Sequence, residues 1–284
     1  MPLRSTPTAR QERLGVELRK MREAAGVTAR DAAKLLGIDP AKVSHIEAGR
    51  LGVSEERLRR LAAFYQCSDG ALIDALSAIT HEQRGQGWWE EYRGILPGPL
   101  RDLAEMEHHA TFLRTIQITH IPGAFQTEDY ARTIFNYSFP PLPQTERDAR
   151  VALRMERQKI LQRDEPPPYD AVIHEAALRV RFGGRRVARA QLVRLQELCE
   201  RPNITMRVIP FEVEEPIGSG HAMHYTGGPV PQLDTVQVDT GTGVIFLDAE
   251  SLLRKYRMIF DAVKSVALSE AESRDLLHTI IREL

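Results

Sequence analysis

One stretch of the sequence decides the fold of the amino-terminal part: residues 35–50 read LLGIDPAKVSHIEAGR. A helical pattern stops at Gly37, and a connection of three residues follows. Asp39 then caps a new helix, and Pro40 takes its first position, where the missing N–H costs nothing. Val43 and Ile46 lie three residues apart and must point inward. The stretch therefore predicts two short helices joined by a tight turn.

Helical patterns continue on both sides of this turn. Residues 10–25 place apolar side chains at three- and four-residue steps, which puts them on one helical face. Thr28, with Asp31 three residues later, marks the start of the next helix, and Ser54 caps a fourth. A fifth pattern runs to Ile79. The first ~80 residues thus predict a unit of five helices that contains a helix-turn-helix.

The segments 35–38 and 43–50 resemble the Cro/cI-type (xenobiotic-response-element, XRE-family) DNA-binding domain. The resemblance covers about residues 10–80 and implies an all-α, lambda-repressor-like domain that binds a double-stranded DNA operator. One position departs from the family pattern. Where the family usually has Gln after the cap of the second helix, this chain has Ala29, so we assign no DNA contact to that position.

The third helix of such a motif enters the major groove and presents its outward side chains to the base edges. Because Val43 and Ile46 point inward, we predict base readout by the outward residues Ala41, Lys42, Ser44 and His45. Phosphate contacts, which set the register without reading sequence, are predicted for Arg10, Arg13, Arg30 and Arg50. We expect Glu47 to hold the turn together. The alternative is that the five helices are a protein-binding module with a solvated basic face.

The charge of the chain is unevenly distributed. Lys plus Arg number 38 and Asp plus Glu 39, a formal net charge of −1. Residues 1–60 hold 13 basic and 8 acidic residues, a balance of +5, and residues 61–284 hold 25 and 31, a balance of −6. A basic head on an acidic body indicates that the head meets a polyanion. The excess is modest, so we expect specific contacts and dimerisation to be needed for tight binding.

Length and composition exclude several classes of protein. The chain has 284 residues, 42% of them hydrophobic and 27% charged, which fits one large or two ordinary globular domains and excludes disorder. No apolar run approaches the roughly 18 residues of a membrane span, and the amino terminus lacks a signal-peptide pattern, so we expect a cytoplasmic protein. Two cysteines cannot form a disulfide scaffold.

A second domain is expected after a polar, glycine-containing linker. We place the first domain at residues 1–80, the linker at 81–87 and the larger domain at 88–284. In the larger domain the patterns predict strands and helices without a strict βαβ rhythm, which favours an α+β fold. The strands are expected near residues 112–118, 171–174, 204–211, 221–225, 235–238 and 244–247. The helices are expected near residues 88–96, 100–109, 127–136, 145–163, 187–198, 249–266 and 269–283.

Four segments of the larger domain, residues 121–132, 154–158, 173–179 and 203–211, are similar to segments of the actinobacterial WhiJ-like regulators. That family joins a Cro/cI-type head to a carboxy-terminal domain of unknown function. Its members are commonly paired with a small co-encoded protein, and some are antitoxin-like. The resemblance therefore implies a transcription regulator with a small partner protein, in a developmental or secondary-metabolism regulon.

No motif for catalysis, metal or cofactor binding emerges. His221 and His224 stand three residues apart, but no third ligand follows at metal-site spacing. The glycine-rich segments 218–220 and 241–243 lack the setting of phosphate loops, and no nucleophile sits in a recognisable elbow. We predict neither an enzyme nor a bound cofactor. An enzyme with a DNA-binding head would need a deep cleft of converging titratable groups.

Two clusters are candidates for a ligand or partner site. Arg150, Arg154 and Arg157 recur at four- and three-residue steps with Gln158 beside them, so one helix carries a stripe of guanidinium groups that could bind an anionic effector or an acidic partner. The alternative is a solvated face paired with neighbouring carboxylates. Trp88, Trp89 and Tyr92 could line a pocket or pack in a core.

Together these features predict a DNA-binding transcription regulator. We expect a homodimer on a two-half-site operator, because protein symmetry and operator symmetry go together in this class. The larger domain would dimerise and sense a small-molecule effector or a small partner protein. The main alternative is an antitoxin-like interaction module that chiefly binds a co-encoded partner, with DNA binding secondary.

Overall fold

The computed structural model of the protein describes residues 7–82, 87–214, 221–240 and 243–284. The chain divides into two compact units. The first comprises Met1–Arg93 and Pro97–Met106, and the second comprises Gly94–Leu96 and Glu107–Leu284. Part of the expected linker, residues 83–86, lies outside the described residues. Residues 88–93 and 97–106, which the sequence places with the larger domain, belong to the first unit.

The first unit is helical. Its elements are α1 (Ala9–Ala24), α2 (Ala29–Leu36), α3 (Pro40–Glu47), α4 (Glu55–Phe64), α5 (Gly70–His81), the 3-10 helix η1 (Trp88–Tyr92) and most of α6 (Gly98–His108). Leu18 of α1, Leu58 of α4 and Leu76 of α5 are fully buried and form part of the core. Each such leucine contributes about 2 kcal/mol when it is removed from water.

Capping side chains set the starts of these helices. The Thr8 hydroxyl accepts the Gln11 N–H while the Gln11 side chain accepts the Thr8 N–H, a reciprocal capping box at the start of α1. Thr28 and Asp31 repeat this arrangement at α2. Single side-chain caps stand at the starts of α3, α4 and α5: Asp39, Ser54 and Asp69. Because these signals are local, the sequence predicts this part of the fold well.

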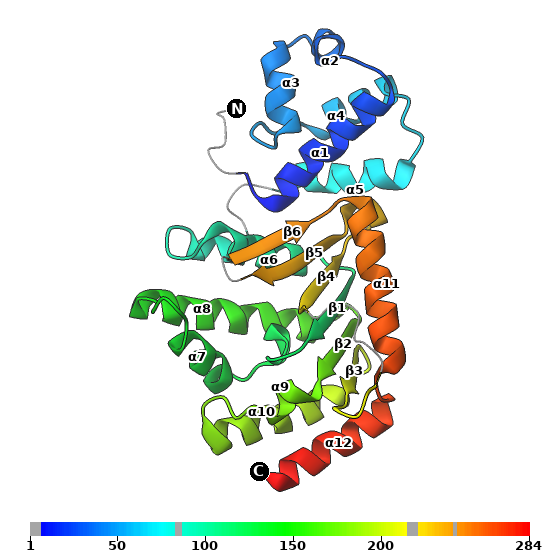
Figure 1. The fold of residues 1–284 in the computed structure, drawn as a ribbon. Coiled ribbons are helices and arrows are strands. Elements are labelled where there is room, and N and C mark those ends of the chain that lie inside the picture. The colour runs from blue at the N-terminus through cyan, green and yellow to red at the C-terminus, as the bar shows by residue number, and fades with distance from the viewer. Residues whose placement is uncertain (1–6, 83–86, 215–220, 241–242) are drawn as a thin grey trace. The chain divides into compact units, whose positions relative to one another are not determined.

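The second unit is built on a mixed sheet, which has six strands among the described residues (Figure 1). The strands are β1 (Phe112–Gln117), β2 (Tyr169–His174), β3 (Ile204–Ile209), β4 (Met223–Gly227), β5 (Thr235–Thr240) and β6 (Gly243–Leu247). Their spatial order is β3-β2-β1-β4-β5-β6. The first three pair in parallel, and β4, β5 and β6 continue antiparallel from β1. β5 therefore runs in the same direction as β1.

Helices cover both faces of this sheet (Figure 1). They are α7 (Glu128–Asn136), α8 (Gln144–Arg157), α9 (Glu175–Arg179), α10 (Gly184–Cys199), α11 (Glu250–Val266) and α12 (Glu270–Glu283), with short 3-10 turns η2 (Gly123–Phe125), η3 (Gln158–Gln162) and η4 (Pro231–Leu233). Alternation along β2 assigns the faces: Ala171 and Ile173 belong to the core formed with α10 and α12, whereas Val172 packs with Leu253 and Phe260 of α11.

This architecture confirms the expected fold class: a helical head followed by an α+β domain. The expected strands and helices of the second unit are present to within a few residues. Two details differ. The helix expected to reach residue 163 becomes a 3-10 turn at Gln158, and α9 follows β2 without a separate sequence signal. No helix among the described residues is long and apolar enough to cross a membrane.

Candidate nucleic-acid interface

The turn between α2 and α3 has the geometry that its sequence predicts. Gly37 ends α2 with φ 65° and ψ 38°, a left-handed conformation that glycine adopts without steric cost. Asp39 caps α3 by accepting the Ala41 N–H at 2.7 Å, and Pro40 occupies the first helical turn. Two short helices are thus joined by a tight connection, which is the arrangement of a helix-turn-helix.

α3 turns one face to the core and the other to solvent. Val43 and Ile46 are 2% and 4% exposed, whereas Ala41, Lys42 and Ser44 are exposed and His45 is partly exposed. The structure therefore brings the four predicted base-reading residues together on the outer face of one helix. Their side chains include a cation, a hydroxyl, an imidazole and a methyl group, which are the groups that read base edges in the major groove.

Close backbone contact fixes α3 against α1. A Cβ built on Gly15 of α1 would lie 2.5 Å from the carbonyl oxygen of Glu47. Gly49, with φ 69°, approaches the backbone of Gln11 equally closely, at 2.9 Å for a Cβ built there. Neither position has room for a side chain, so these two glycines allow the helix axes to approach. The carboxy-terminal end of α3 consequently has a defined position on the first unit.

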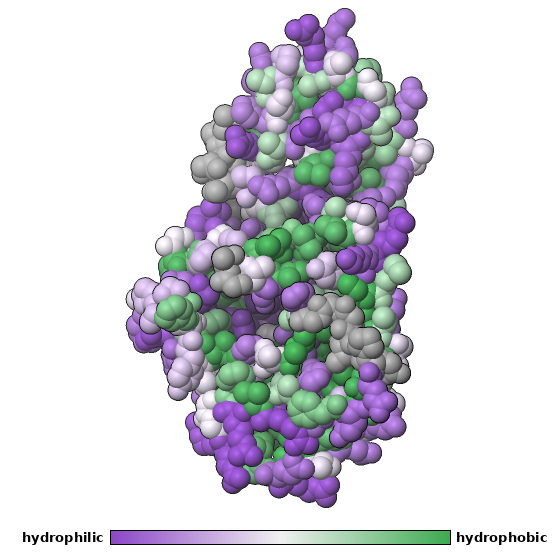
Figure 2. Space-filling view, in the orientation of Figure 1, coloured by the Kyte–Doolittle hydropathy of each residue, from purple (hydrophilic) through white to green (hydrophobic). Residues whose placement is uncertain are grey.

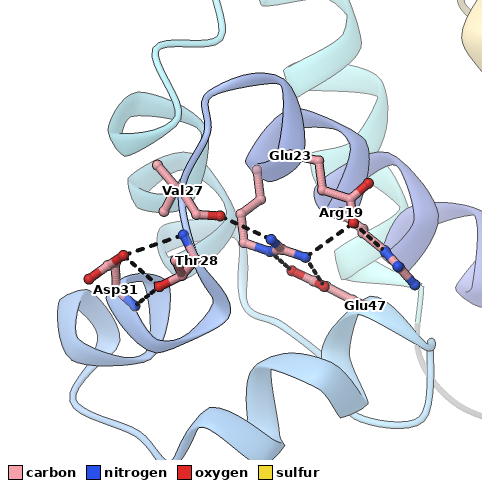
Figure 3. A network of polar contacts seen from close by, with 7 residues as sticks. Arg19, Glu23, Val27, Thr28, Asp31 and Glu47 are labelled. Carbon is pink, nitrogen blue, oxygen red and sulfur yellow. Dashed lines mark hydrogen bonds and ion pairs between the residues drawn. The ribbon is translucent and has the colours of Figure 1, made fainter.

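A partly buried ion pair adds to this attachment. Arg22 near the end of α1 donates Nε–H to Glu47 Oε1 at 2.6 Å and Nη2–H to Oε2 at 2.9 Å, while its Nη1–H binds the Val27 carbonyl at 3.0 Å. Figure 3 shows Glu47 within this network, next to the Thr28–Asp31 cap. The bond with Glu47 raises the pKa of Arg22. Glu47 is thus a structural residue of the turn.

The four arginines predicted to contact phosphates fall into two groups. Arg30 on α2 and Arg50 after α3 are exposed. Arg13 is 7% exposed and lies against Glu17 at 3.4 Å, and Arg10 donates to both carboxylate oxygens of Glu82. Phosphate contacts by Arg10 and Arg13 would require these ion pairs to open, so we base the proposal below on Arg30 and Arg50.

One further exposed basic residue lies near Arg30, and the sequence analysis did not include it among the predicted phosphate contacts. Lys34 is exposed on α2, four residues after Arg30, so the two side chains lie on one face of the helix. The first helix of this motif crosses the DNA backbone when the second enters the groove. The four-residue spacing of Arg30 and Lys34 was the signal in the sequence.

The arginine stripe lies on α8 of the second unit, where each side chain has a different environment. Arg150 binds Glu146, and Arg157 binds the buried Glu107 through two bonds of 2.6 and 2.7 Å. Burial alone would raise the pKa of Glu107, but the charge and hydrogen bonds of Arg157 lower it to about 2. These two arginines are therefore neutralised.

Arg154 and Gln158 differ from these two arginines in their bonding partners. The Arg154 guanidinium donates to the neutral Gln126 Oε1 at 2.6 Å, and the Gln158 amide donates to the Gln126 carbonyl at 2.7 Å. The stripe is thus neither a uniform solvated face nor a single guanidinium cluster. One cation without a carboxylate partner among the described residues lies beside the loop that follows β1.

Trp88, Trp89 and Tyr92 lie in η1 of the first unit and not with this stripe. Trp88 makes edge-on contacts with both Trp89 and Tyr92, with ring centroids 5.7 and 6.4 Å apart, and Trp89 is buried. These contacts are those of aromatic residues packed in a core.

Metal ligation finds no support in the part of the chain that the structure describes, where no three His, Cys, Asp or Glu side chains cluster around a common point. His224 on β4 is buried, with Nε2 at 3.1 Å from Glu107 Oε1, whereas His221 is exposed. The two histidines therefore lie in different environments, one buried and one exposed.

Two protein families match this chain, and together they cover most of it. Residues 13–76 match a helix-turn-helix domain family, and residues 100–279 match a domain of unknown function, DUF5753. No curated protein and no solved structure matches the chain significantly. The first match coincides with the helices α1–α5 described above, and the second includes the whole sheet with α7–α11. The chain thus joins a helix-turn-helix head to a larger carboxy-terminal domain and belongs to the DUF5753 family.

Proposed function

We propose that the protein is a sequence-specific DNA-binding regulator of transcription, with α3 as its recognition helix. The observation that carries the proposal is the outward face of α3, where Ala41, Lys42, Ser44 and His45 stand together on a helix held by close backbone packing. Lys42 and His45 donate hydrogen bonds to base edges. Ser44 binds a base or a phosphate, and Ala41 contacts a thymine methyl group.

Phosphate contacts set the position of α3 in the groove. Arg30 and Lys34 on α2 bind the backbone on one side of the groove, and Arg50 binds it after the end of α3. All three side chains are exposed. We also propose that residues 1–80 form the DNA-binding domain, that 81–87 form the linker and that 88–284 form the regulatory domain.

The second unit provides dimerisation and control. A single recognition helix contacts few base pairs, so a homodimer on two half-sites supplies the affinity that one modestly basic head lacks. The second unit senses a small ligand or a small partner protein and shifts the population between DNA-competent and incompetent arrangements. The resemblance to WhiJ-like regulators supports this division of labour.

A specific observation favours a protein partner as the second candidate. Tyr137 and Phe139, between α7 and α8, are 83% and 96% exposed. Exposed aromatic side chains are typical anchors of protein–protein interfaces. An antitoxin-like function, in which the second unit chiefly binds a small co-encoded protein, would use this surface.

The test begins with operators selected from random DNA by the full-length protein. Lys42→Ala and His45→Ala should lower the affinity for the selected operator by about tenfold or more while leaving nonspecific affinity within about twofold. Arg59→Ala is the matched control, because Arg59 on α4 is held by Glu55 and Asp74. Failure to select any sequence, or unchanged selectivity of the α3 variants, would overturn the proposal.

A further inference from the structure

Arg154 of α8 is a partly buried cation that forms no ion pair with a carboxylate among the described residues. Its Nη1 donates to the neutral Gln126, and its Nε is buried with no hydrogen-bond partner there. Burial, with the charge of Arg157, lowers the pKa of Arg154 to about 10. Proteins rarely bury an ionised group without pairing it, because the loss of hydration is costly. Its bonding therefore leaves room for an anion that the described residues do not supply.

The surroundings of Arg154 hold its guanidinium in place. The ring of Phe135 lies 4.8 Å from the guanidinium carbon, and a Cβ built on Gly123 would lie 3.5 Å from it. Gln158 ties the same loop to α8 through the carbonyls of Gly123 and Gln126. A guanidinium positioned in this way loses little conformational freedom when it binds an oxyanion.

The site lies where sheets with parallel strands commonly bind ligands, beside the carboxyl ends of the strands. The loop after β1 supplies His120, Gly123 and Gln126, and β5, which runs in the same direction as β1, ends near Asp239. Figure 2 shows hydrophilic side chains among apolar ones on the face of this unit that carries α8 in Figure 1. Arg154 itself is partly exposed, so a small molecule can reach its guanidinium.

The charge of the site selects the class of ligand. Arg150 and Arg157 are neutralised by Glu146 and Glu107. Burial, together with the charge of Arg154, lowers the pKa of His120, so this imidazole is neutral at pH 7. Arg154 offers one positive charge without a carboxylate bonded to it, and the exposed Asp239 acts on it through space with a negative charge. A monoanion suits this cation better than a dianion such as a phosphate ester, because Asp239 would repel the second negative charge.

We propose that Arg154 binds the carboxylate of a small monoanionic ligand beside the loop that follows β1. The free donors of its guanidinium form charge-assisted hydrogen bonds with the carboxylate, and the ligand supplies the charge that the described residues lack. If the second unit senses an effector, as proposed above, that effector would be a small carboxylate. Only this regulatory role rests on the proposed function. The binding itself is independent of DNA.

The experiment titrates full-length, 15N-labelled protein without DNA with sodium acetate and with sodium benzoate, at ionic strength held constant with sodium chloride. The Nε–H resonance of Arg154 is assigned by its loss in Arg154→Gln. We expect a saturable shift of this resonance, with binding weakened about tenfold in Arg154→Lys, which keeps the charge but not the fork. Arg150→Gln is the matched control and should bind as the parent protein does.

Three results would overturn the proposal: no saturable shift with either carboxylate up to tens of millimolar, equal loss of binding in Arg150→Gln, or binding of inorganic phosphate at least as tight as that of carboxylates. Benzamide, the neutral analogue of benzoate, should not bind. The outcome is separate from that of the DNA test, because operator selection can fail while carboxylate binding persists, and the reverse also holds.

Discussion

Arg22 on α1 and Glu47, the last residue of α3, form a two-bond ion pair in which both side chains are about nine-tenths buried. Losing either partner would leave the other with its charge-assisted hydrogen bonds unmade. The pair therefore fixes where α3 ends and which way its outer face points.

Replacing Glu47 with Ala should lower the free energy of unfolding of the first unit by about 1–3 kcal/mol, because Arg22 would lose two charge-assisted hydrogen bonds and keep only the longer contact with Glu23. Arg19→Ala removes the exposed Arg19–Glu23 pair on the same helix and should leave the stability nearly unchanged, because solvent screens exposed ion pairs. Both tryptophans of the chain lie in the first unit, so denaturant unfolding followed by tryptophan fluorescence reports on this unit. Equal small losses in the two variants would show that the pair does not hold α3.

Gly15→Ala should increase the distance between α1 and the end of α3. The new methyl group would lie 2.5 Å from the Glu47 carbonyl oxygen, so the helices must move apart at a cost of about 1–3 kcal/mol. We also expect weaker operator binding by the folded fraction, because the recognition helix shifts. Gly70→Ala at the start of α5 is the control, since its Cβ meets nothing within 4 Å. Loss of stability without loss of operator affinity would argue that α3 keeps its position.

The sequence predicts those parts of the fold that local signals determine. The caps Thr28, Asp39 and Ser54 mark three helix starts correctly, and the inward positions Val43 and Ile46 assign the outer face of α3. Periodicity likewise locates the strands of the second unit.

Ion pairs between residues far apart in the sequence cannot be predicted from local patterns. Arg10 lies near a basic surface in sequence but binds Glu82, 72 residues away. Arg13 was grouped with the basic residues of the first ~80 positions, but it lies on the buried face of α1. Its four-residue spacing to Glu17 was the local signal of an ion pair. The polar segment 81–87, expected as the linker, does not end the first packing unit, which takes in η1 and most of α6. That Arg154 bonds to the neutral Gln126, and to no carboxylate of the described residues, depends on tertiary contacts that spacing does not reveal.

The stability of the first unit should fall as the pH rises from about 5 to 8. Burial raises the pKa of Glu105 on α6 to about 7, an effect that its hydrogen bond with Thr8 only partly offsets, and burial raises the pKa of Asp102 to about 6. The folded state therefore binds more protons than the unfolded state between about pH 4.5 and 7. The stabilisation is complete below the unfolded pKa values and is lost as the pH rises through the folded ones.

Glu105→Gln should remove much of this dependence, because an amide does not ionise at the site. The full effect of a shift of this size is about 3 kcal/mol. Thermal unfolding followed by tryptophan fluorescence at about pH 5 and pH 8 measures it, with Glu23→Gln on the exposed face of α1 as the control. A parent protein that is equally stable at both pH values would contradict the desolvated state of Glu105.

The salt dependence of operator binding should distinguish exposed arginines from engaged ones. Each phosphate contact releases condensed counter-ions, so log K falls with log salt by about 0.9 per contact. Arg50→Ala and Arg30→Ala should each reduce this slope by about 1. Arg59→Ala should leave it unchanged, because Glu55 and Asp74 already hold that guanidinium at 2.8 Å. Fluorescence anisotropy of a labelled operator at several salt concentrations gives the slopes. If Arg10→Ala lowered the slope as much as Arg50→Ala, the bond to Glu82 would have to open on DNA, and our division of the four arginines would be wrong.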